Sequence, residues 1–154
     1  MTTHYVESFD SPLGIVEVTA SEKGVISIYF VEKHAEKQHK NFHSSLAVTQ
    51  LGEYFSKSRT QFDLTLTPTG TEFQKRVWQA LLTVQYGQTV SYSDIANAID
   101  NPKAVRAVGA ANGKNPLSIV VPCHRIIGKH GALTGYAGGM DRKAALLVLE
   151  KEEF

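Results

Sequence analysis

The chain has 154 residues, of which 42% are apolar and 20% charged, and its formal net charge is +1 at pH 7. This composition is typical of globular proteins, and the length allows one domain or two small ones. No run of 18 apolar residues and no basic start followed by an apolar stretch occurs, so we expect neither a membrane span nor a secretory signal. The single cysteine excludes an internal disulfide and favours a reducing, cytoplasmic setting.

The charge is unevenly distributed along the chain. Residues 1–68 carry six Lys and Arg against eight Asp and Glu, whereas residues 69–154 carry ten against seven. Between residues 103 and 143, seven basic residues stand against one acidic residue, Asp141. This segment is compatible both with a surface that meets phosphate groups and with an ordinary solvated face.

The first half predicts short strands followed by a helix. The stretches "HYVESFD", "IVEVTA" and "GVISIYF" are separated by the turns "SPLG" and "SEKG", which predicts an antiparallel meander. The polar stretch 32–43 predicts a loop, and its three histidines are interpreted as solvated surface and not as a metal site. Apolar residues recur at helical spacing over 45–55. The segment "TPTG" at 67–70 then predicts a boundary between an N-terminal domain, 1–68, and a C-terminal domain, 69–154.

The second half predicts three helices. The pattern T-x-x-Q at 71–74 and the pattern S-x-x-D at 91–94 both indicate a capped helix start. The dipeptide N-P at 101–102 predicts a third helix over 102–112, with Asn as the N-cap and Pro in the first turn. The second and third helices, joined by a tight turn, make a helix-turn-helix candidate.

The third predicted helix carries small residues beside its apolar face. One stripe at helical spacing combines a single long side chain with three small residues: Arg106, Gly109, Ala110 and Gly113. A helix that reads base edges in the major groove usually presents long polar side chains. Glycine inside a helix costs about 1 kcal/mol relative to alanine, so Gly109 needs a reason. Close packing against another helix is one reason, and close approach to a narrow DNA groove with Arg106 as the probe is the other.

The only cysteine follows an apolar segment. Residues 117–121 form a β-branched, apolar run between two prolines, which predicts a buried strand ending at Cys123. A lone buried cysteine is often an inert core residue. Basic neighbours such as His124 and Arg125 would instead lower the pKa of the thiol and make it reactive. Spacing leaves both interpretations open, because a strand sends adjacent side chains to opposite faces, although a water could bridge Cys123 and His124.

Several long motifs occur in one order: "NPKAVRAVGAANGKNP" at 101–116, "PCHR" at 122–125 and "GALTGYAGG" at 131–139. Together they closely resemble the O6-alkylguanine-DNA alkyltransferases, also called methylated-DNA–protein-cysteine methyltransferases. The resemblance covers residues 70–154, and residues 1–69 fit it in length and in strand-then-helix order. It implies an α/β (α+β) fold, with a small ribonuclease H-like N-terminal domain of antiparallel sheet plus helix. The C-terminal domain would be mainly helical, with a helix-turn-helix and a winged-helix-like character.

The resemblance also implies an activity. A damaged base is flipped out of the duplex, and its alkyl group passes irreversibly, in a single turnover, to Cys123. The substrate is O6-alkylguanine in DNA, with O4-methylthymine as a further substrate. His124 acts on Cys123 through a water, Glu150 orients His124, and Asn115 holds the turn before the active-site strand. No cofactor and no metal are expected, and the partner is double-stranded DNA bound by a monomer through the minor groove.

Further site residues follow from the same resemblance. Arg106 matches the arginine inserted in place of the flipped base, Tyr92 the tyrosine that rotates the phosphate and bonds the base, and Lys143 a lysine near the thiol. The remaining expected base and DNA contacts are Arg125, Ile126, Tyr136, Ala137, Gly138, Gly109, Ala110 and Gly113. Ser118 stands where some relatives have proline, which predicts an altered acceptance of bulky O6 substituents.

Three other functions compete with this one. A non-catalytic alkyltransferase-like protein that signals to excision repair would lack the cysteine that is present here as Cys123. A helix-turn-helix transcription regulator is disfavoured by the small residues over 106–113 and by the lack of an obvious dimerisation segment. A cysteine hydrolase on an unrelated fold is disfavoured because no other histidine has an acidic partner at a recognisable spacing.

Overall fold

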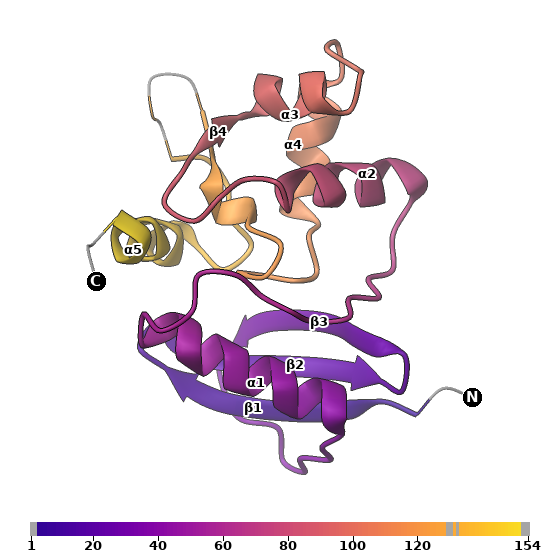
Figure 1. The fold of residues 1–154 in the computed structure, drawn as a ribbon, viewed down its shortest axis with the longest axis vertical. Coiled ribbons are helices and arrows are strands. Elements are labelled where there is room, and N and C mark those ends of the chain that lie inside the picture. The colour runs from indigo at the N-terminus through magenta and orange to yellow at the C-terminus, as the bar shows by residue number, and fades with distance from the viewer. Residues whose placement is uncertain (1–2, 129–130, 132, 152–154) are drawn as a thin grey trace. The chain divides into compact units, whose positions relative to one another are not determined.

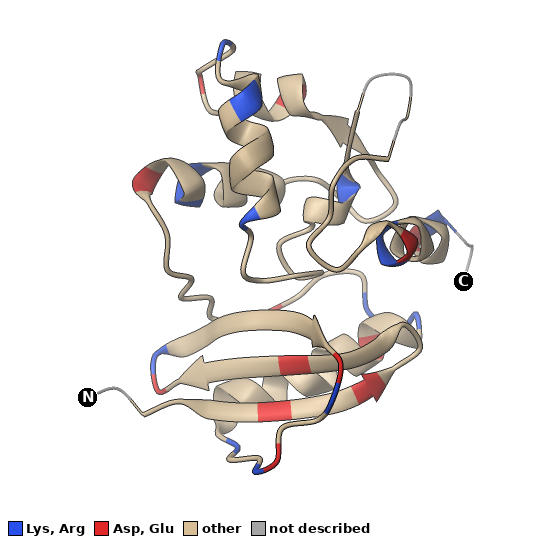
Figure 2. Cartoon of the chain, turned by 180° about the vertical axis from the view of Figure 1, so that it is seen from behind, with Lys and Arg blue, Asp and Glu red and all other residues tan. Residues whose placement is uncertain are grey.

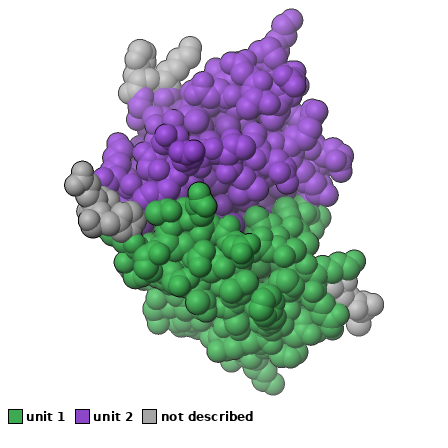
Figure 3. Space-filling view, in the orientation of Figure 1, with its two compact units in different colours: residues 1–69, 154 green, residues 70–153 purple. Residues whose placement is uncertain are grey.

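The computed structural model describes residues 3–128, 131 and 133–151 (Figure 1). The chain divides into two compact units, with the boundary between Thr69 and Gly70 (Figure 3). Within the described ranges, no helix is long and apolar enough to cross a membrane.

The first unit is a three-stranded sheet with one helix. Strands β1 (Tyr5–Ser11), β2 (Gly14–Ser21) and β3 (Gly24–Val31) pair antiparallel in that order. Helix α1 (Phe42–Phe55) lies along the sheet and contacts all three strands (Figure 1). Alternate residues of β2 are buried, as expected for a sheet with one covered face. The predicted antiparallel meander and the α/β class are confirmed.

Helix α1 begins three residues earlier than the apolar spacing predicts. Asn41 accepts a hydrogen bond from the backbone N–H of Ser44 at 2.8 Å, and the Ser44 hydroxyl accepts one from the Asn41 N–H at 2.9 Å. The hydroxyls of Ser44 and Ser45 also donate to the buried carboxylate of Glu7, at 2.7 and 2.8 Å. A reciprocal cap therefore sets the start, inside the stretch predicted to be a loop.

The histidines of that polar stretch have contacts within the first unit. Nδ1 of His34 lies 2.7 Å from the hydroxyl of Ser8, and its Nε2 lies 3.1 Å from Asp10. His39 exchanges two backbone hydrogen bonds with Val6. These bonds cover part of the outer edge of β1, where backbone groups would otherwise be open to other strands. In the described part of the chain, no group of three or more His, Cys, Asp or Glu is placed to hold a metal ion.

The second unit carries helices around a small parallel ladder. Its elements are α2 (Glu72–Leu81), β4 (Val90–Ser91), α3 (Tyr92–Ala98), α4 (Val105–Gly113), the short 3₁₀ helix η1 (Cys123–Arg125), β5 (Ile126–Ile127) and α5 (Met140–Lys151). Strands β4 and β5 pair in parallel. The predicted starts of α2 and α3 are confirmed, because Thr71 with Gln74 and Ser91 with Asp94 each form a reciprocal cap. The indole N–H of Trp78 donates to the carbonyl of Ala111 at 2.9 Å and joins α2 to α4.

The third predicted helix starts later than the sequence indicates. Asn101 is not its N-cap, because the Asn101 N–H donates back to Ala96 at 2.9 Å and its carbonyl accepts from Ala104 at 3.0 Å. These bonds make residues 101–104 a turn. The first helical bond runs from Val108 to Ala104, so α4 begins at Val105 with no side-chain cap.

The predicted strand over 117–121 is wrong. The Val121 N–H donates to Leu117 at 2.9 Å and the Val120 N–H to Ser118 at 2.8 Å, so the chain turns back on itself. Ile119 has a φ of +73°, which a β-branched residue rarely adopts. All five residues are buried, and the apolar run therefore indicates burial and not an extended backbone.

Candidate active site

Cys123 is the first residue of η1 and lies at the end of the buried turn. Its backbone N–H donates to Val121 at 2.7 Å, and only 2% of the residue is exposed. The turn itself is fixed by Asn115, whose amide donates to the carbonyl of Val121 at 2.9 Å and whose oxygen accepts from the Leu117 N–H at 2.9 Å. One side chain thus replaces the ladder hydrogen bonds that a strand would supply.

His124 and Glu150 form a buried pair beside Cys123. Nε2 of His124 lies 2.6 Å from Oε2 of Glu150, and the histidine is 0% exposed. Glu150 reaches the site because it follows Lys143 and Leu146 along the inward face of α5. With Nε2 committed to the carboxylate, the other ring nitrogen, Nδ1, is buried and has no hydrogen-bond partner among the described residues. In the tautomer that donates to Glu150, Nδ1 carries the free lone pair that a base needs.

Arg125 holds the same carboxylate from its other side. Its Nε donates to Oε1 of Glu150 at 2.8 Å and its Nη2 to Oε2 at 3.0 Å, while Nη1 donates to the carbonyl of Val84 at 2.8 Å. The Gly87 N–H also points to Oε1, at 3.4 Å. Arg125 is only 6% exposed. The expected contact of Arg125 with DNA does not fit this placement, because all three nitrogens of its guanidinium are engaged inside the unit.

Burial dominates the electrostatics of the site. It raises the pKa of Cys123 from 9.0 to about 11, and the opposing influences of Asn115 and Lys143 are smaller. Of the two interpretations that spacing leaves open, a lowered pKa does not fit, because burial outweighs the lowering influence of Lys143. Burial also lowers the pKa of His124, although Glu150 acts in the opposite direction. At neutral pH the site accordingly contains a thiol and a neutral imidazole, so the proton must leave sulfur during the reaction.

Glu150 is an ionised carboxylate beside His124 and Arg125. Burial would raise the pKa of its carboxyl, but hydrogen bonds from His124 and Arg125 together outweigh burial and hold it at about 2. A carboxylate that stays ionised at this position keeps the His124 ring oriented and can stabilise an imidazolium when one forms.

The structure also places Lys143, Tyr136 and Tyr92, three more of the predicted residues. Lys143 is fully buried, its Nζ donates to the carbonyl of Thr134 at 2.9 Å, and burial lowers its pKa. The ring of Tyr136 lies edge-on to that of His124, with centroids 6.5 Å apart, and burial raises the pKa of its hydroxyl. The hydroxyl of Tyr92 shares a hydrogen bond with the hydroxyl of Thr134. Thr134 was not among the predicted site residues, and its place within "GALTGYAGG" is the only signal of it in the sequence.

The other pocket residues predicted from the resemblance lie in the segments after η1. Ile126 is buried in β5, and its N–H donates to the carbonyl of Cys123. Ala137 and Gly138 lie in a turn closed by a hydrogen bond of 2.9 Å from the Gly139 N–H to the carbonyl of Tyr136. The carbonyl of Gly138 accepts from Nη1 of Arg142 at 3.1 Å.

The stripe on α4 is open to solvent. Arg106, Ala110 and Gly113 are exposed. A Cβ added at Gly109 would lie 3.7 Å from the Tyr92 ring, an ordinary contact distance, and one added at Gly113 would meet nothing. Packing within the unit therefore does not require these glycines, and the close-packing explanation is not supported.

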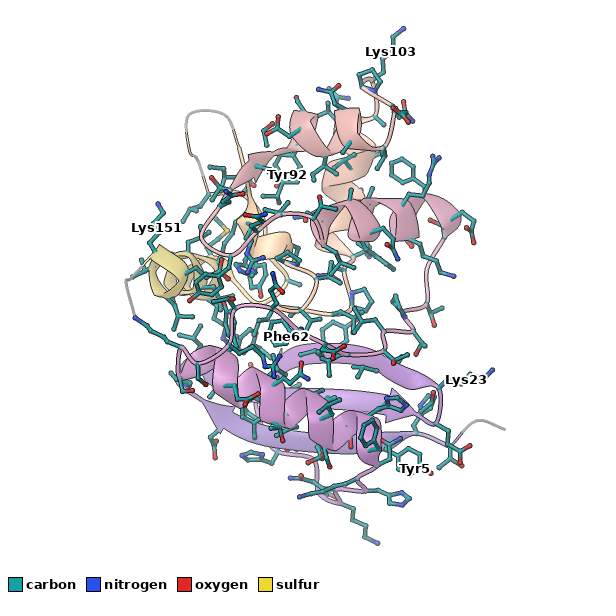
Figure 4. The ribbon with its side chains drawn as sticks, in the orientation of Figure 1. Tyr5, Lys23, Phe62, Tyr92, Lys103 and Lys151 are labelled. Atoms are coloured by element: carbon teal, nitrogen blue, oxygen red, sulfur yellow. The ribbon has the colours of Figure 1, made fainter. Side chains whose placement is uncertain are left out.

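The basic residues of 103–143 differ in exposure. Arg125 and Lys143 are buried and Arg142 is half-buried, whereas Lys103, Arg106 and Lys114 are exposed on α4 and just before and after it. Lys129 lies outside the described residues. Figure 2 shows Lys and Arg along this helix, and Figure 4 shows Lys103 projecting from the turn. Arg125 and Lys143 are thus unavailable to a phosphate-facing surface, whereas the exposed residues on and beside α4 are available to one.

Two family models match the chain. Residues 72–152 match "6-O-methylguanine DNA methyltransferase, DNA binding domain", and residues 4–68 match "6-O-methylguanine DNA methyltransferase, ribonuclease-like domain". The chain belongs to the 6-O-methylguanine DNA methyltransferase family. The family predicted from the motifs is therefore confirmed.

Relatives within this methyltransferase family match over nearly the whole chain. The methylated-DNA–protein-cysteine methyltransferase of Mycobacterium tuberculosis is 47% identical over 153 residues, which cover 96% of this chain and 92% of the relative. The protein of the same name from Methanosarcina barkeri is 45% identical and is covered to 97%. The crystal structure of the M. tuberculosis O6-methylguanine methyltransferase superimposes with a TM-score of 0.88, covering 97% of this chain and 93% of that one. A crystal structure of M. tuberculosis OGT in complex with DNA matches with a TM-score of 0.85 at 47% identity, covering 94% of this chain and 91% of that one.

Proposed function

We propose that this protein repairs alkylated DNA by direct reversal, moving the alkyl group of O6-alkylguanine irreversibly to Cys123. The observation that carries the proposal is the buried His124 that follows Cys123 in η1. Its Nε2 lies 2.6 Å from the carboxylate of Glu150, and its Nδ1 has no hydrogen-bond partner among the described residues. Membership of the methyltransferase family supports it.

The proposed reaction is one displacement at carbon. The sulfur of Cys123 attacks the alkyl carbon, a sulfur–carbon bond forms, and the bond between that carbon and O6 breaks. The thiol proton passes to Nδ1 of His124 through a water, and Glu150 stabilises the imidazolium. One proton returns to the base, which leaves as unmodified guanine. Since the thioether has no route back to a thiol, each molecule reacts once. The same displacement applies to O4-methylthymine.

The proposed partner is double-stranded DNA, approached from the minor groove by α4. The stripe over 106–113 has one long side chain, Arg106, which would take the place of the flipped base. The small residues Gly109, Ala110 and Gly113 would allow the backbone to come close to the duplex. A repair protein has to accept any flanking sequence, so phosphate contacts should dominate over base contacts.

Further expectations complete the proposal. We expect Tyr92 to face the phosphate and the base, and Tyr136, Ala137 and Gly138 to line the pocket that receives the base. The C-terminal domain, 69–154, would carry DNA binding and alkyl transfer, and the N-terminal domain, 1–68, would support it. The protein would act as a monomer in the cytoplasm without a cofactor. Ser118 would change the acceptance of bulky O6 substituents.

Mass spectrometry tests the proposed function directly. The intact protein is mixed with a duplex that contains one O6-methylguanine, and the expected result is a stoichiometric gain of one methyl group on the peptide that contains Cys123. The Cys123→Ala variant should show no gain. Tight binding of the duplex without any gain in mass would instead mean recognition without repair, as in an alkyltransferase-like protein.

A further inference from the structure

Thr134 connects two side chains that the proposed function uses separately. Its hydroxyl is hydrogen-bonded to the hydroxyl of Tyr92, the first residue of α3, which Figure 4 labels. Its carbonyl accepts from Nζ of Lys143 on α5 at 2.9 Å. The hydroxyl of Thr134 is thus bonded to a helix next to α4, and its carbonyl is bonded to the lysine near the thiol.

The two partners lie at different ends of the site. The ring of Tyr92 is close enough to α4 that a Cβ added at Gly109 would be 3.7 Å from it. Lys143 is fully buried, and its charge is one of the influences that lower the pKa of Cys123. Contacts thus run from the stripe on α4 through Tyr92 and Thr134 to Lys143, whose charge acts on the sulfur of Cys123.

A hydroxyl can donate one hydrogen bond and accept others, so the direction of the Tyr92–Thr134 bond has a consequence. When Thr134 donates to the phenolic oxygen, the Tyr92 proton is released to point at a ligand. We propose that Thr134 is a positioning residue for the flipped base, whose hydroxyl orients the Tyr92 hydroxyl while its carbonyl holds the Lys143 ammonium beside Cys123. This role rests on the proposed function.

The turn that follows Thr134 is held without the Thr134 hydroxyl. Backbone groups anchor the following turn: the Gly139 N–H donates to Tyr136 at 2.9 Å, and the Lys143 N–H donates to Gly139 at 3.1 Å. Arg142 adds a bond of 3.1 Å to the carbonyl of Gly138. A change that removes only the Thr134 hydroxyl should therefore leave both this turn and the Lys143 bond intact.

A double-mutant cycle tests the role. Thr134→Val removes the hydroxyl and keeps both the shape and the carbonyl, Thr134→Ser is the matched control, and Tyr92→Phe removes the partner hydroxyl. We expect Thr134→Val to slow methyl transfer from an O6-methylguanine duplex by about tenfold, the loss typical of one hydrogen bond. Thr134→Ser should stay close to the parent rate. The double variant should be no slower than Tyr92→Phe alone, because both changes remove the same interaction.

Two controls separate a positioning role from general damage. Labelling of Cys123 by iodoacetamide should be unchanged in Thr134→Val, because the carbonyl still holds Lys143. A parent rate of transfer in Thr134→Val, or losses that multiply in the double variant, would overturn the role.

The same cycle can be measured without chemistry, as binding of the lesion duplex in a Cys123→Ala background. Non-additive losses of binding would support the positioning role of Thr134. They would do so even if the parent protein transferred no methyl group, and that absence of transfer would refute only the proposed function. Additive losses of binding would contradict the positioning role of Thr134 and would leave the proposed function unaffected.

Discussion

Replacing Glu150 by Gln removes a buried negative charge from the proposed active site. The carboxylate accepts from His124 at 2.6 Å and from Arg125 at 2.8 and 3.0 Å. Gln keeps the size of the side chain but leaves the buried guanidinium of Arg125 without a counter-charge. Breaking a buried ion pair by removing one partner costs about 3–5 kcal/mol of stability.

The pKa of Glu150 gives a similar magnitude for its contribution to stability and also gives the direction in which that contribution changes with pH. Burial would raise this pKa, but hydrogen bonds from His124 and Arg125 hold it at about 2, against an ordinary value of 4.5. A carboxyl with a lower pKa in the folded chain stabilises the fold above its ordinary pKa and loses that contribution as the pH falls toward the folded value. At about 1.4 kcal/mol for each pH unit, the full contribution is about 3 kcal/mol.

Urea unfolding at a series of pH values measures this contribution. At about pH 7 we expect Glu150→Gln to be about 3 kcal/mol less stable than the parent. The deficit should shrink below about pH 4.5, because the unfolded parent then takes up a proton at Glu150 that the folded parent does not. Glu53→Gln is the matched control, because Glu53 accepts from Nε of Arg59 at 3.0 Å and its side chain is 43% exposed. An exposed pair of this kind contributes about 0–1 kcal/mol.

Two results would refute this reasoning. Equal losses in Glu150→Gln and Glu53→Gln would mean that burial does not strengthen the pair. A deficit for Glu150→Gln that stays the same from neutral to acidic pH would mean that the carboxylate is not held ionised by His124 and Arg125. Methyl transfer by the same variant should slow about 100-fold or more, since positioned general-base catalysis contributes about that much.

Other substitutions test the DNA-facing stripe and the surroundings of the thiol. Arg106→Ala should slow transfer from duplex DNA by about 100-fold, the scale of unstacking a base, and should barely change reaction with the free base; equal losses on both substrates would contradict its role. Gly109→Ala should raise the free energy of unfolding by about 0.5–1 kcal/mol but weaken duplex binding. Gly52→Ala in α1, where an added Cβ meets nothing, should give the stability gain alone. Unchanged binding in Gly109→Ala would exclude a close approach there. Lys143→Met should slow iodoacetamide labelling of Cys123 at mildly alkaline pH, because the ammonium lowers the pKa of the thiol; an unchanged pH profile would remove Lys143 from the electrostatics of the site.

The sequence predicted helix starts correctly where a few neighbouring residues determine them. Helices α2 and α3 begin where Thr71 and Ser91 indicate, because a cap needs only a side chain and a backbone N–H three residues later. The same logic failed at Asn101, whose N–H is bonded to Ala96 in the preceding helix. A turn that is bonded to the preceding helix cannot be recognised from the residues that follow the turn.

The apolar run before Cys123 shows a second limit. Burial and strand formation select the same β-branched residues, so 117–121 could not be distinguished from a strand by composition. What makes the segment a turn is Asn115, whose side chain bonds both Leu117 and Val121. The partner of Arg125 was hidden for a different reason: Glu150 is 25 residues away, and spacing does not indicate which way a guanidinium points.

Burial of Cys123, His124 and Glu150 explains how the thiol can be unreactive at rest and still react with its substrate. The same desolvation raises the pKa of Cys123 and lowers that of His124, so neither is charged at neutral pH and the sulfur is a weak nucleophile at rest. Glu150, kept ionised by hydrogen bonds from His124 and Arg125, is a fixed negative charge beside the ring, and it favours an imidazolium at the moment a proton arrives. The site can therefore form its thiolate when a substrate carbon is aligned to take the sulfur's electrons. For a protein spent by a single reaction, a thiol that is unreactive until then avoids loss to other electrophiles.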